Sequence, residues 1–426
     1  MKRALIVILL IVVAALGAVA WLNFHEDDPP APAVASTPDA VERVSRGRYL
    51  ARVGNCAGCH TSRGGATYAG GRGIPTPFGI VFASNLTSDP KVGLGNWSSD
   101  DFWRALHDGR SRDGHLLYPA FPYTNYTEVT REDADALFAF LSTVPAAPQP
   151  NRPHELRFPY DSQAALAVWR ALYFRPGVYR SDPAHDDPWN RGAYLVRGLG
   201  HCSACHSTRN LLGATAADDE FQGGQLPAQG WYAPSLTLNG EAGVGQWETG
   251  DVVDLLTKGV TPRATVLGPM AEVVYRSTQY LSAADATAIA VFLKSLSGNT
   301  PAWRSTSTVI ADYEPTFGPG RKIFEDHCAG CHGKRGEGGE GVVPLAGNRA
   351  VMLDSPVNVI RAILSGGFPP GTASNPRPQG MPPFAPFLND NEVASVATYI
   401  RNAWGNGARV VQGWEVAREG RGASSN

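Results

Sequence analysis

Charge is scarce in this sequence, and its two signs nearly cancel. Asp, Glu, Lys and Arg make up 18% of the 426 residues, and the formal net charge is -2. A chain without a basic field has no electrostatic attraction to nucleic acid, which we exclude as a partner. Hydrophobic residues make up 43% of the chain, and Gly (47) and Pro (33) are frequent. Length and composition predict several compact, turn-rich domains rather than a disordered chain.

Long hydrophobic runs are also scarce, and the clearest one lies at the N-terminus. Lys2 and Arg3 precede an uncharged stretch, Ala4–Phe24, which as a helix can cross the roughly 30 Å core of a bilayer. We predict that residues 1–25 form a retained membrane anchor. A signal peptide cleaved near Ala18–Ala20 is the alternative. In both cases the positive end stays in the cytoplasm, so the remaining chain lies on the periplasmic side of a bacterial inner membrane.

Cysteine is scarce too, and its pattern is the strongest functional signal. The six cysteines form three Cys-x-x-Cys pairs, and a histidine follows each pair directly. The three motifs are Cys56, Cys59 and His60; Cys202, Cys205 and His206; and Cys328, Cys331 and His332. In such a motif the two thiols bond covalently to the haem and the histidine binds the iron. A redox dithiol and half a zinc site are the alternatives. Three copies that use every cysteine of an exported chain predict three covalently bound haem c groups and no structural disulfide.

The segments around the three motifs repeat a common pattern. Each motif follows a helical lead-in with a glycine and an aromatic residue, namely Gly47–Leu50, Gly192–Leu195 and Gly320–Phe324. Each segment ends in a predicted helix with a capping box. The capping residues are Thr130 and Asp133, Ser282 and Asp285, and Asn389 and Glu392. These helices share a buried stripe at i, i+3, i+4 spacing. Its members are Leu137, Phe140 and Leu141; Ile289, Phe292 and Leu293; and Val396, Tyr399 and Ile400.

The repeats predict a mainly α fold of three tandem class I cytochrome c-like domains, each with haem between its first and last helices. The predicted domains are 41–145, 186–300 and 313–410. The remaining parts are linkers at 26–40 and 301–312, a connector at 146–185 and a C-terminal tail at 411–426. The connector includes a predicted helix at 162–174, whose apolar surface either joins the domains or docks a partner.

Methionine, the usual second axial ligand of small cytochromes c, occurs only four times. Met270 and Met381 lie shortly before the closing helices of the second and third domains, so we predict that they bind iron. Met352 lies on an apolar stretch and is expected to fill the core. Thioether ligation raises the haem potential, which makes the second and third haems the more oxidising.

The first domain has Phe121 where the ligating methionine is expected. Phenylalanine cannot bind iron, so this haem is bis-histidine, is five-coordinate or has an unusual ligand. His115 is our first candidate for the distal ligand, and His107 is the second. A second histidine ligand predicts a lower potential than that of the other two haems.

Several longer segments resemble the triheme cytochrome c subunits of membrane-bound bacterial dehydrogenases. The resemblance extends from Val44 to Arg418. It is carried by Leu117–Tyr123, Trp189–Leu195, Gly200–Cys202, Thr208–Asn210 and Asn402–Asn406. Such subunits serve quinoprotein (PQQ) alcohol dehydrogenases, flavin-dependent gluconate and fructose dehydrogenases, and molybdenum-containing aldehyde or N-heterocycle oxidoreductases. Phe121 and the polar end at 421–426 favour a molybdenum-type partner.

The resemblance implies an electron-transfer subunit rather than an enzyme on its own, without catalytic residues. Electrons from the large dehydrogenase subunit would pass to ubiquinone or a terminal oxidase. Two other functions stay open. The chain could be a free periplasmic electron shuttle, or a peroxidase-like haem enzyme if the first iron has an open position.

Overall fold

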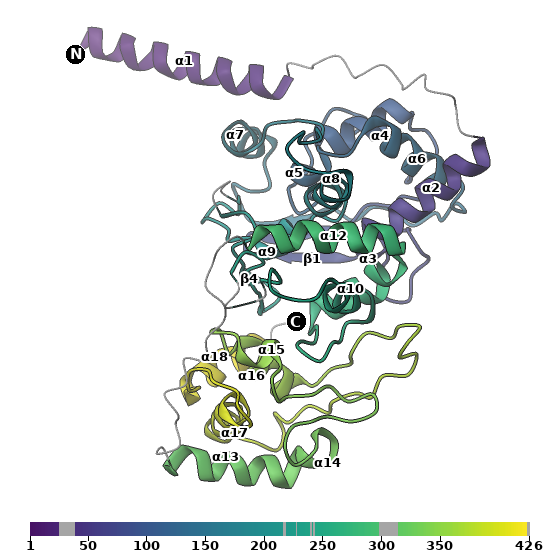
Figure 1. The fold of residues 1–426 in the computed structure, drawn as a ribbon. Helices are drawn as coiled ribbons and strands as arrows, with labels where there is room; N and C mark the ends of the chain where they lie inside the picture. The colour runs from purple at the N-terminus through teal and green to yellow at the C-terminus, as the bar shows by residue number, and fades with distance from the viewer. Residues whose placement is uncertain are drawn as a thin grey trace. The chain divides into compact units, whose positions relative to one another are not determined.

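The computed structural model describes residues 1–24, 39–215, 219–226, 228–238, 241, 243–297 and 314–423. Helices dominate this part of the chain and the strands are short (Figure 1), as the sequence predicts. The predicted linkers at 26–40 and 301–312 lie outside the described residues, except for Asp39 and Ala40.

Up to residue 181 the helices are α1 (Lys2–Phe24), α2 (Ala40–Val53), α3 (Cys56–Cys59), α4 (Ser99–His107), α5 (Tyr123–Tyr126), α6 (Arg131–Leu141) and α7 (Gln163–Tyr173). The strands of this part are β1 (Gly73–Thr76), β2 (Gly79–Phe82) and β3 (Glu155–Leu156), which form an antiparallel sheet in the order β1-β2-β3. Its register pairs Gly73 with Phe82 and Gly79 with Leu156.

The next part contains α8 (Asp187–Tyr194), the π-helical turn η1 (Leu195–Leu199), α9 (Ser203–His206), α10 (Thr249–Lys258), α11 (Pro269–Arg276), the 3-10 turn η3 (Thr278–Tyr280) and α12 (Ala283–Leu296). Strands β4 (Gly224–Leu226) and β5 (Trp231–Ala233) form an antiparallel hairpin there. The last part contains α13 (Glu314–His327), α14 (Ala329–His332), α15 (Arg349–Met352), α16 (Val357–Ser365), α17 (Asp390–Asn402) and α18 (Gly413–Ala423).

The chain divides into two compact units. The first consists of Met1–Ser181, Val196–Ala204 and Arg209–Thr215, and the second of Asp182–Leu195, Cys205–Thr208 and Ala216–Asn426. The first unit therefore joins the N-terminal helix, the first predicted domain and most of the connector. The second joins most of the two later predicted domains. The three-domain division stays a prediction.

Three helix pairs repeat one arrangement within the described chain: α2 packs on α6, α8 on α12, and α13 on α17. A glycine lies at each crossing. A Cβ at Gly47 would lie 1.8 Å from the carbonyl oxygen of Ala136, one at Gly192 would lie 2.0 Å from that of Ala288, and one at Gly320 would lie 2.3 Å from that of Ser395. No side chain fits at such distances. The repeated glycine is therefore required by close approach of two helix backbones.

The closing helices α6, α12 and α17 begin at the predicted N-caps, and the predicted capping box is confirmed for Asn389 and Glu392 of α17, while those of α6 and α12 stay predictions. Thr130, Ser282 and Asn389 are the N-caps, and their side chains accept hydrogen bonds from backbone N–H groups of the first turn. The predicted apolar stripes of all three helices are buried. Each helix thus presents one apolar face to its partner helix, which is the main stabilising contact of the pair.

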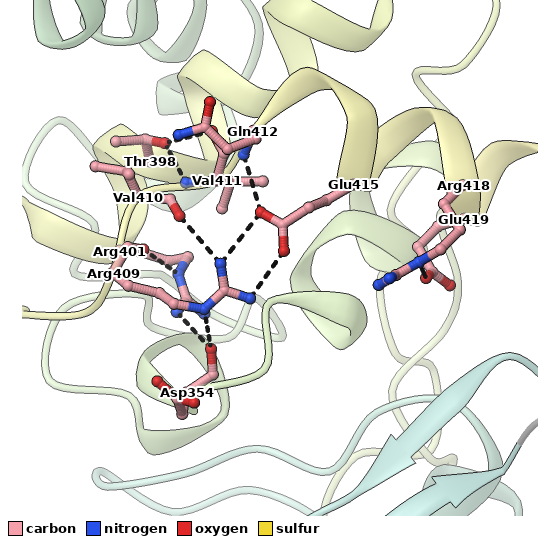
Figure 2. Close-up of polar contacts among 10 residues, drawn as sticks. All are labelled: Asp354, Thr398, Arg401, Arg409, Val410, Val411, Gln412, Glu415, Arg418 and Glu419. Carbon is pink, nitrogen blue, oxygen red and sulfur yellow. Dashed lines mark hydrogen bonds and ion pairs between the residues drawn. The ribbon is translucent and has the colours of Figure 1, made fainter.

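The predicted tail at 411–426 includes a packed helix, α18, rather than only a polar extension. Figure 2 shows how polar groups join it to α17, with the Nη2 of Arg409 2.8 Å from Oε1 of Glu415. Arg401 is fully buried beside this pair and donates from Nη1 to the carbonyl oxygen of Val351 at 3.1 Å. Burial lowers the pKa of Arg401 to about 10, and the positive charge of Arg409 acts in the same direction. Nη2 of Arg401 and Nε of Arg409 also donate to the carbonyl oxygen of Asp354, at 3.4 and 3.0 Å, which holds the turn after α15 against α17.

Candidate haem sites

A single helical turn marks each Cys-x-x-Cys-His motif, after the first helix of a pair. Helix α3 runs from Cys56 to Cys59, whereas α9 and α14 begin directly after Cys202 and Cys328 and end at the motif histidine. The two-residue spacing of the cysteines is the spacing that attachment to one ring edge requires. All six cysteines lie in described residues, and no disulfide joins them.

The three motif histidines have the same second contact. Nδ1 of His60 lies 2.7 Å from the carbonyl oxygen of Ser84, that of His206 lies 2.8 Å from Pro234 O, and that of His332 lies 3.1 Å from Val343 O. Burial lowers the pKa of each imidazole. A neutral ring that donates from Nδ1 presents the lone pair of Nε2, and such a hydrogen bond orients metal-binding histidines.

Antiparallel pairing positions each of these carbonyl groups. Ser84 follows the hairpin strand β2, and Pro234 directly follows β5. Val343 directly follows an antiparallel bridge between Gly339 and Val342. Two buried side chains, Asn85 and Ser235, stand next to the first two acceptors. They accept hydrogen bonds from the backbone N–H groups of residues 87 and 237, at 2.9 and 3.2 Å, which fixes the local turn.

The third site contains a largely apolar cavity. Cys328, His332 and Met381 all line it, together with apolar side chains of α16 and α17 such as Ile363 and Ile400. A thiol, an imidazole and a thioether thus face one largely apolar space. This donor set matches a covalently attached haem with one histidine and one methionine ligand.

Thr265 and Leu267 also line this cavity, although they belong to the second predicted domain. Asn348 donates to the hydroxyl of Thr265 at 3.1 Å, and the N–H of Arg349 donates to the carbonyl of Arg263 at 2.8 Å. The segment that leads to Met270 therefore closes one side of the third site.

Met270 lies in the first turn of α11, where it packs on Val266, Ala271 and Val274. It is partly buried. Met352 is buried in α15 and 6% exposed, as expected for a core side chain. Met381 therefore shares a cavity with His332, and ligation of iron by Met381 and by Met270 stays a prediction for both.

Phe121 packs against Tyr126, with ring centroids 5.2 Å apart. Burial raises the pKa of Tyr126, and the nearby thiols of Cys56 and Cys59 contribute in the same direction. An aromatic pair thus lies beside the first motif.

The two histidines predicted near this haem are placed differently from each other. His115 has a half-exposed side chain, which forms an ion pair with Asp113. His107 is partly buried, stacks on Trp103 at 4.7 Å and places Nδ1 2.9 Å from the carbonyl oxygen of Thr127. The distal ligand of the first haem stays a prediction.

His201 is a residue of this site that the sequence analysis missed. Its ring packs edge-on against Tyr126, and Nε2 lies 3.4 Å from the carbonyl oxygen of Gly54, two residues before Cys56. Burial lowers the pKa of His201. Its φ of 39° is positive, a backbone region that costs energy for a residue with a Cβ. Its position directly before Cys202 was visible in the sequence, but its contact with the first motif was not.

The two alternative uses of a Cys-x-x-Cys pair fit these sites poorly. Burial raises the pKa of Cys56 to about 12 and that of Cys328 to about 11, whereas redox dithiols have lowered pKa values. In the part of the chain that the structure describes, no three His, Cys, Asp or Glu side chains gather as a metal site would require.

Comparison with known proteins agrees with this chemistry. The cytochrome c family model matches residues 44–145 and 318–404. The quinone-dependent alcohol dehydrogenase cytochrome c subunit of Gluconacetobacter polyoxogenes is 36% identical, over 88% of this chain and 84% of that protein. This chain belongs to the cytochrome c subunits of dehydrogenases. The gluconate 2-dehydrogenase cytochrome c subunit of Pantoea cypripedii is 36% identical over 86% of each chain.

A further relative is a subunit of the nicotinate dehydrogenase of Pseudomonas putida, 39% identical over 87% of this chain. The chain spans 31% of that longer protein. Membership of the cytochrome c family implies covalently bound haem c and electron transfer. One N-terminal helix, Lys2–Asn23, is long and apolar enough to cross a membrane, as an anchor or a signal sequence.

Proposed function

We propose that this chain is a triheme electron-transfer subunit, held on the periplasmic side of the bacterial inner membrane by α1. The observation that carries the proposal is the threefold repetition of one site. Each copy has a motif turn, a histidine with its Nδ1 bonded to a carbonyl group, and a glycine at a helix crossing. Local sequence, local geometry and packing therefore repeat together.

The cysteine pairs would hold three haem c groups through thioether bonds, and His60, His206 and His332 would be the proximal ligands. Met381 and Met270 would be the distal ligands of the third and second haems. His115 is the proposed distal ligand of the first. When bound, haem c supplies one-electron redox chemistry. The protein side chains set its potential through ligand type and burial, with Met381 raising that of the third site.

Two contacts support a linear order of the three sites. The hydrogen bond between His201 and Gly54 joins the first motif to the residue directly before Cys202. Thr265 and Leu267, which precede Met270, line the cavity of the third site.

The partner would be a large dehydrogenase subunit of molybdenum, PQQ or flavin type, oxidising an aldehyde, an alcohol or an N-heterocycle. The acceptor would be ubiquinone or a terminal oxidase. The relatives named above are cytochrome subunits or parts of such dehydrogenases, which supports this assignment. Phe121, which stands where a ligating methionine is expected, favours a partner of the molybdenum type.

Haem counting tests the proposal. Intact mass and a pyridine haemochrome assay on the purified chain should give three haems. Cys59→Ser, Cys205→Ser and Cys331→Ser should each weaken attachment at one site while the other two stay loaded. A chain that carries two haems would contradict the triheme proposal.

A second experiment tests the dehydrogenase role. Reduction of all three haems by the substrate of a co-purifying large subunit would support this role, whereas isolation without any partner would favour a free shuttle. Binding of CO to the reduced chain would indicate an open iron.

A further inference from the structure

Helix α7 buries its charged side chain. Arg170 lies inside the protein, and Gln163, although exposed at the start of the helix, bonds through its side-chain amide to a neighbouring loop. Gln163 accepts a hydrogen bond from the N–H of Leu116 at 2.7 Å and donates to the carbonyl of the same residue at 3.1 Å. Arg170 is 4% exposed and donates to Asn23 at 3.0 Å. A surface helix in water normally shows the opposite pattern, with charges outside.

The outward face of α7 is apolar. Val168 and Leu172, one turn apart, are 46% and 61% exposed, and Tyr173 is 38% exposed. The turn at 211–212 extends this face, because the indole of Trp169 donates to the carbonyl of Leu212 at 2.8 Å. Leu211 is 96% exposed. Contiguous exposed apolar surface of this kind indicates a contact that is not water.

The N-terminal helix identifies that contact. Asn23, at the end of α1, is 1% exposed and donates to the carbonyl oxygen of Ala167 in α7 at 2.9 Å. Residues Lys2–Asn23 form the helix that can cross a bilayer. The point where this helix leaves the membrane is therefore bonded to α7. Arg175 and Arg180 follow α7 and are exposed, where they can meet anionic lipid headgroups.

We propose that α7 and the adjoining Leu211–Leu212 turn lie in the interfacial layer of the bilayer, as a second membrane contact besides α1. The inference rests on the proposed retention of α1 as an anchor. A lipid surface fits better than a protein partner, because the apolar face adjoins the end of the anchor and carries no charge of its own. Such a contact would restrict the orientation of the first haem site relative to the membrane.

Depth-dependent fluorescence quenching tests this contact in the full-length, haem-loaded chain. The chain is placed in nanodiscs of phosphatidylcholine and phosphatidylglycerol, and Leu172→Cys is labelled with the environment-sensitive dye NBD. We expect blue-shifted emission that lipids with a shallow doxyl group quench. Val41→Cys, an apolar and 73% exposed position of α2 in the same unit, is the matched control and should be quenched less.

Equal quenching at the two positions, or no quenching at residue 172, would overturn the inference. Protection of residue 172 from aqueous iodide without quenching by lipid would assign the face to a protein instead, and would overturn it as well. If Leu172→Cys fails to load haem, Val168→Cys on the same face gives the same readout. The unmodified chain separates this test from the haem proposal, because its cysteines should not react with the dye when all are in thioether bonds.

Discussion

The glycine at the crossing of α13 and α17 allows a test with a control on the same helix. A Cβ at Gly320 would lie 2.3 Å from the carbonyl oxygen of Ser395 and 2.9 Å from the Cβ of Tyr399. The two helices must therefore separate by about 1 Å to reach an ordinary contact distance. A Cβ at Gly318 meets no atom within 4 Å. Gly318→Ala makes the same substitution on the same helix without touching α17, although its Cβ adjoins the ring of Pro319.

The expected free energies follow from two opposing terms. Overpacking costs about 1–3 kcal/mol, and a backbone oxygen that cannot rotate away places Gly320→Ala at the upper end. Replacing glycine by alanine in a helix stabilises the helix by about 1 kcal/mol. We expect a net loss of about 2 kcal/mol for Gly320→Ala, a shift of about 30-fold in the opening equilibrium. Gly318 precedes Pro319, whose ring disfavours a Cβ on the preceding helical residue and offsets the usual gain, so Gly318→Ala should change the stability by less than about 0.5 kcal/mol.

Native-state hydrogen exchange with mass spectrometry measures this difference, because it resolves the stability of individual segments. Amides of α13 and α17 should lose protection in Gly320→Ala and keep it in Gly318→Ala, relative to the unmodified haem-loaded chain. Peptides from α2 and α6, which form another helix pair, are the internal reference and should not change. Equal protection in the two variants would refute the close-crossing argument.

The remaining predictions concern the haem sites. Met381→Leu should remove one near-infrared methionine–iron band of the oxidised chain and lower the potential of one haem, because the thioether ligand is lost. Met352→Leu, which changes a buried core side chain, is its control and should keep both. Phe121→Met should add a band and raise the potential of the first haem. His201→Phe keeps the ring that packs on Tyr126 but removes the bond to Gly54. It should slow electron exchange between the first two haems after flash photoreduction without moving their potentials.

Several outcomes would contradict these expectations. Three methionine–iron bands in the unmodified chain would show that the first haem has a methionine ligand despite Phe121. An unchanged spectrum in Met381→Leu would remove Met381 as a ligand. An unchanged exchange rate in His201→Phe would show that the hydrogen bond to Gly54 is not part of the path. His201→Gln, which keeps a donor at this position, should restore part of the rate if the bond matters.

The sequence alone predicted much of the local structure. The motifs, the lead-in and closing helices, their N-caps and their buried stripes follow from spacing and side-chain chemistry within about ten residues, which local physical rules cover. The helix of the connector, α7, was also predicted at its place. The packed helix α18 was missed because its stability comes from the burial of Val416 and Glu415 against other elements, and its many polar residues suggested a tail.

The contacts between distant segments could be known only from the tertiary structure. His201 and Gly54 are 147 residues apart, and Thr265 reaches a cavity whose cysteine, histidine and methionine come from another predicted domain. The sequence also showed that the segments before each motif contain a glycine, but not that its absent Cβ makes room for a carbonyl oxygen of the closing helix. Covalent attachment of haem needs only a few adjacent residues, so the sequence alone can predict it. Coupling between sites depends on which surfaces fold together, and adjacent residues do not carry that information.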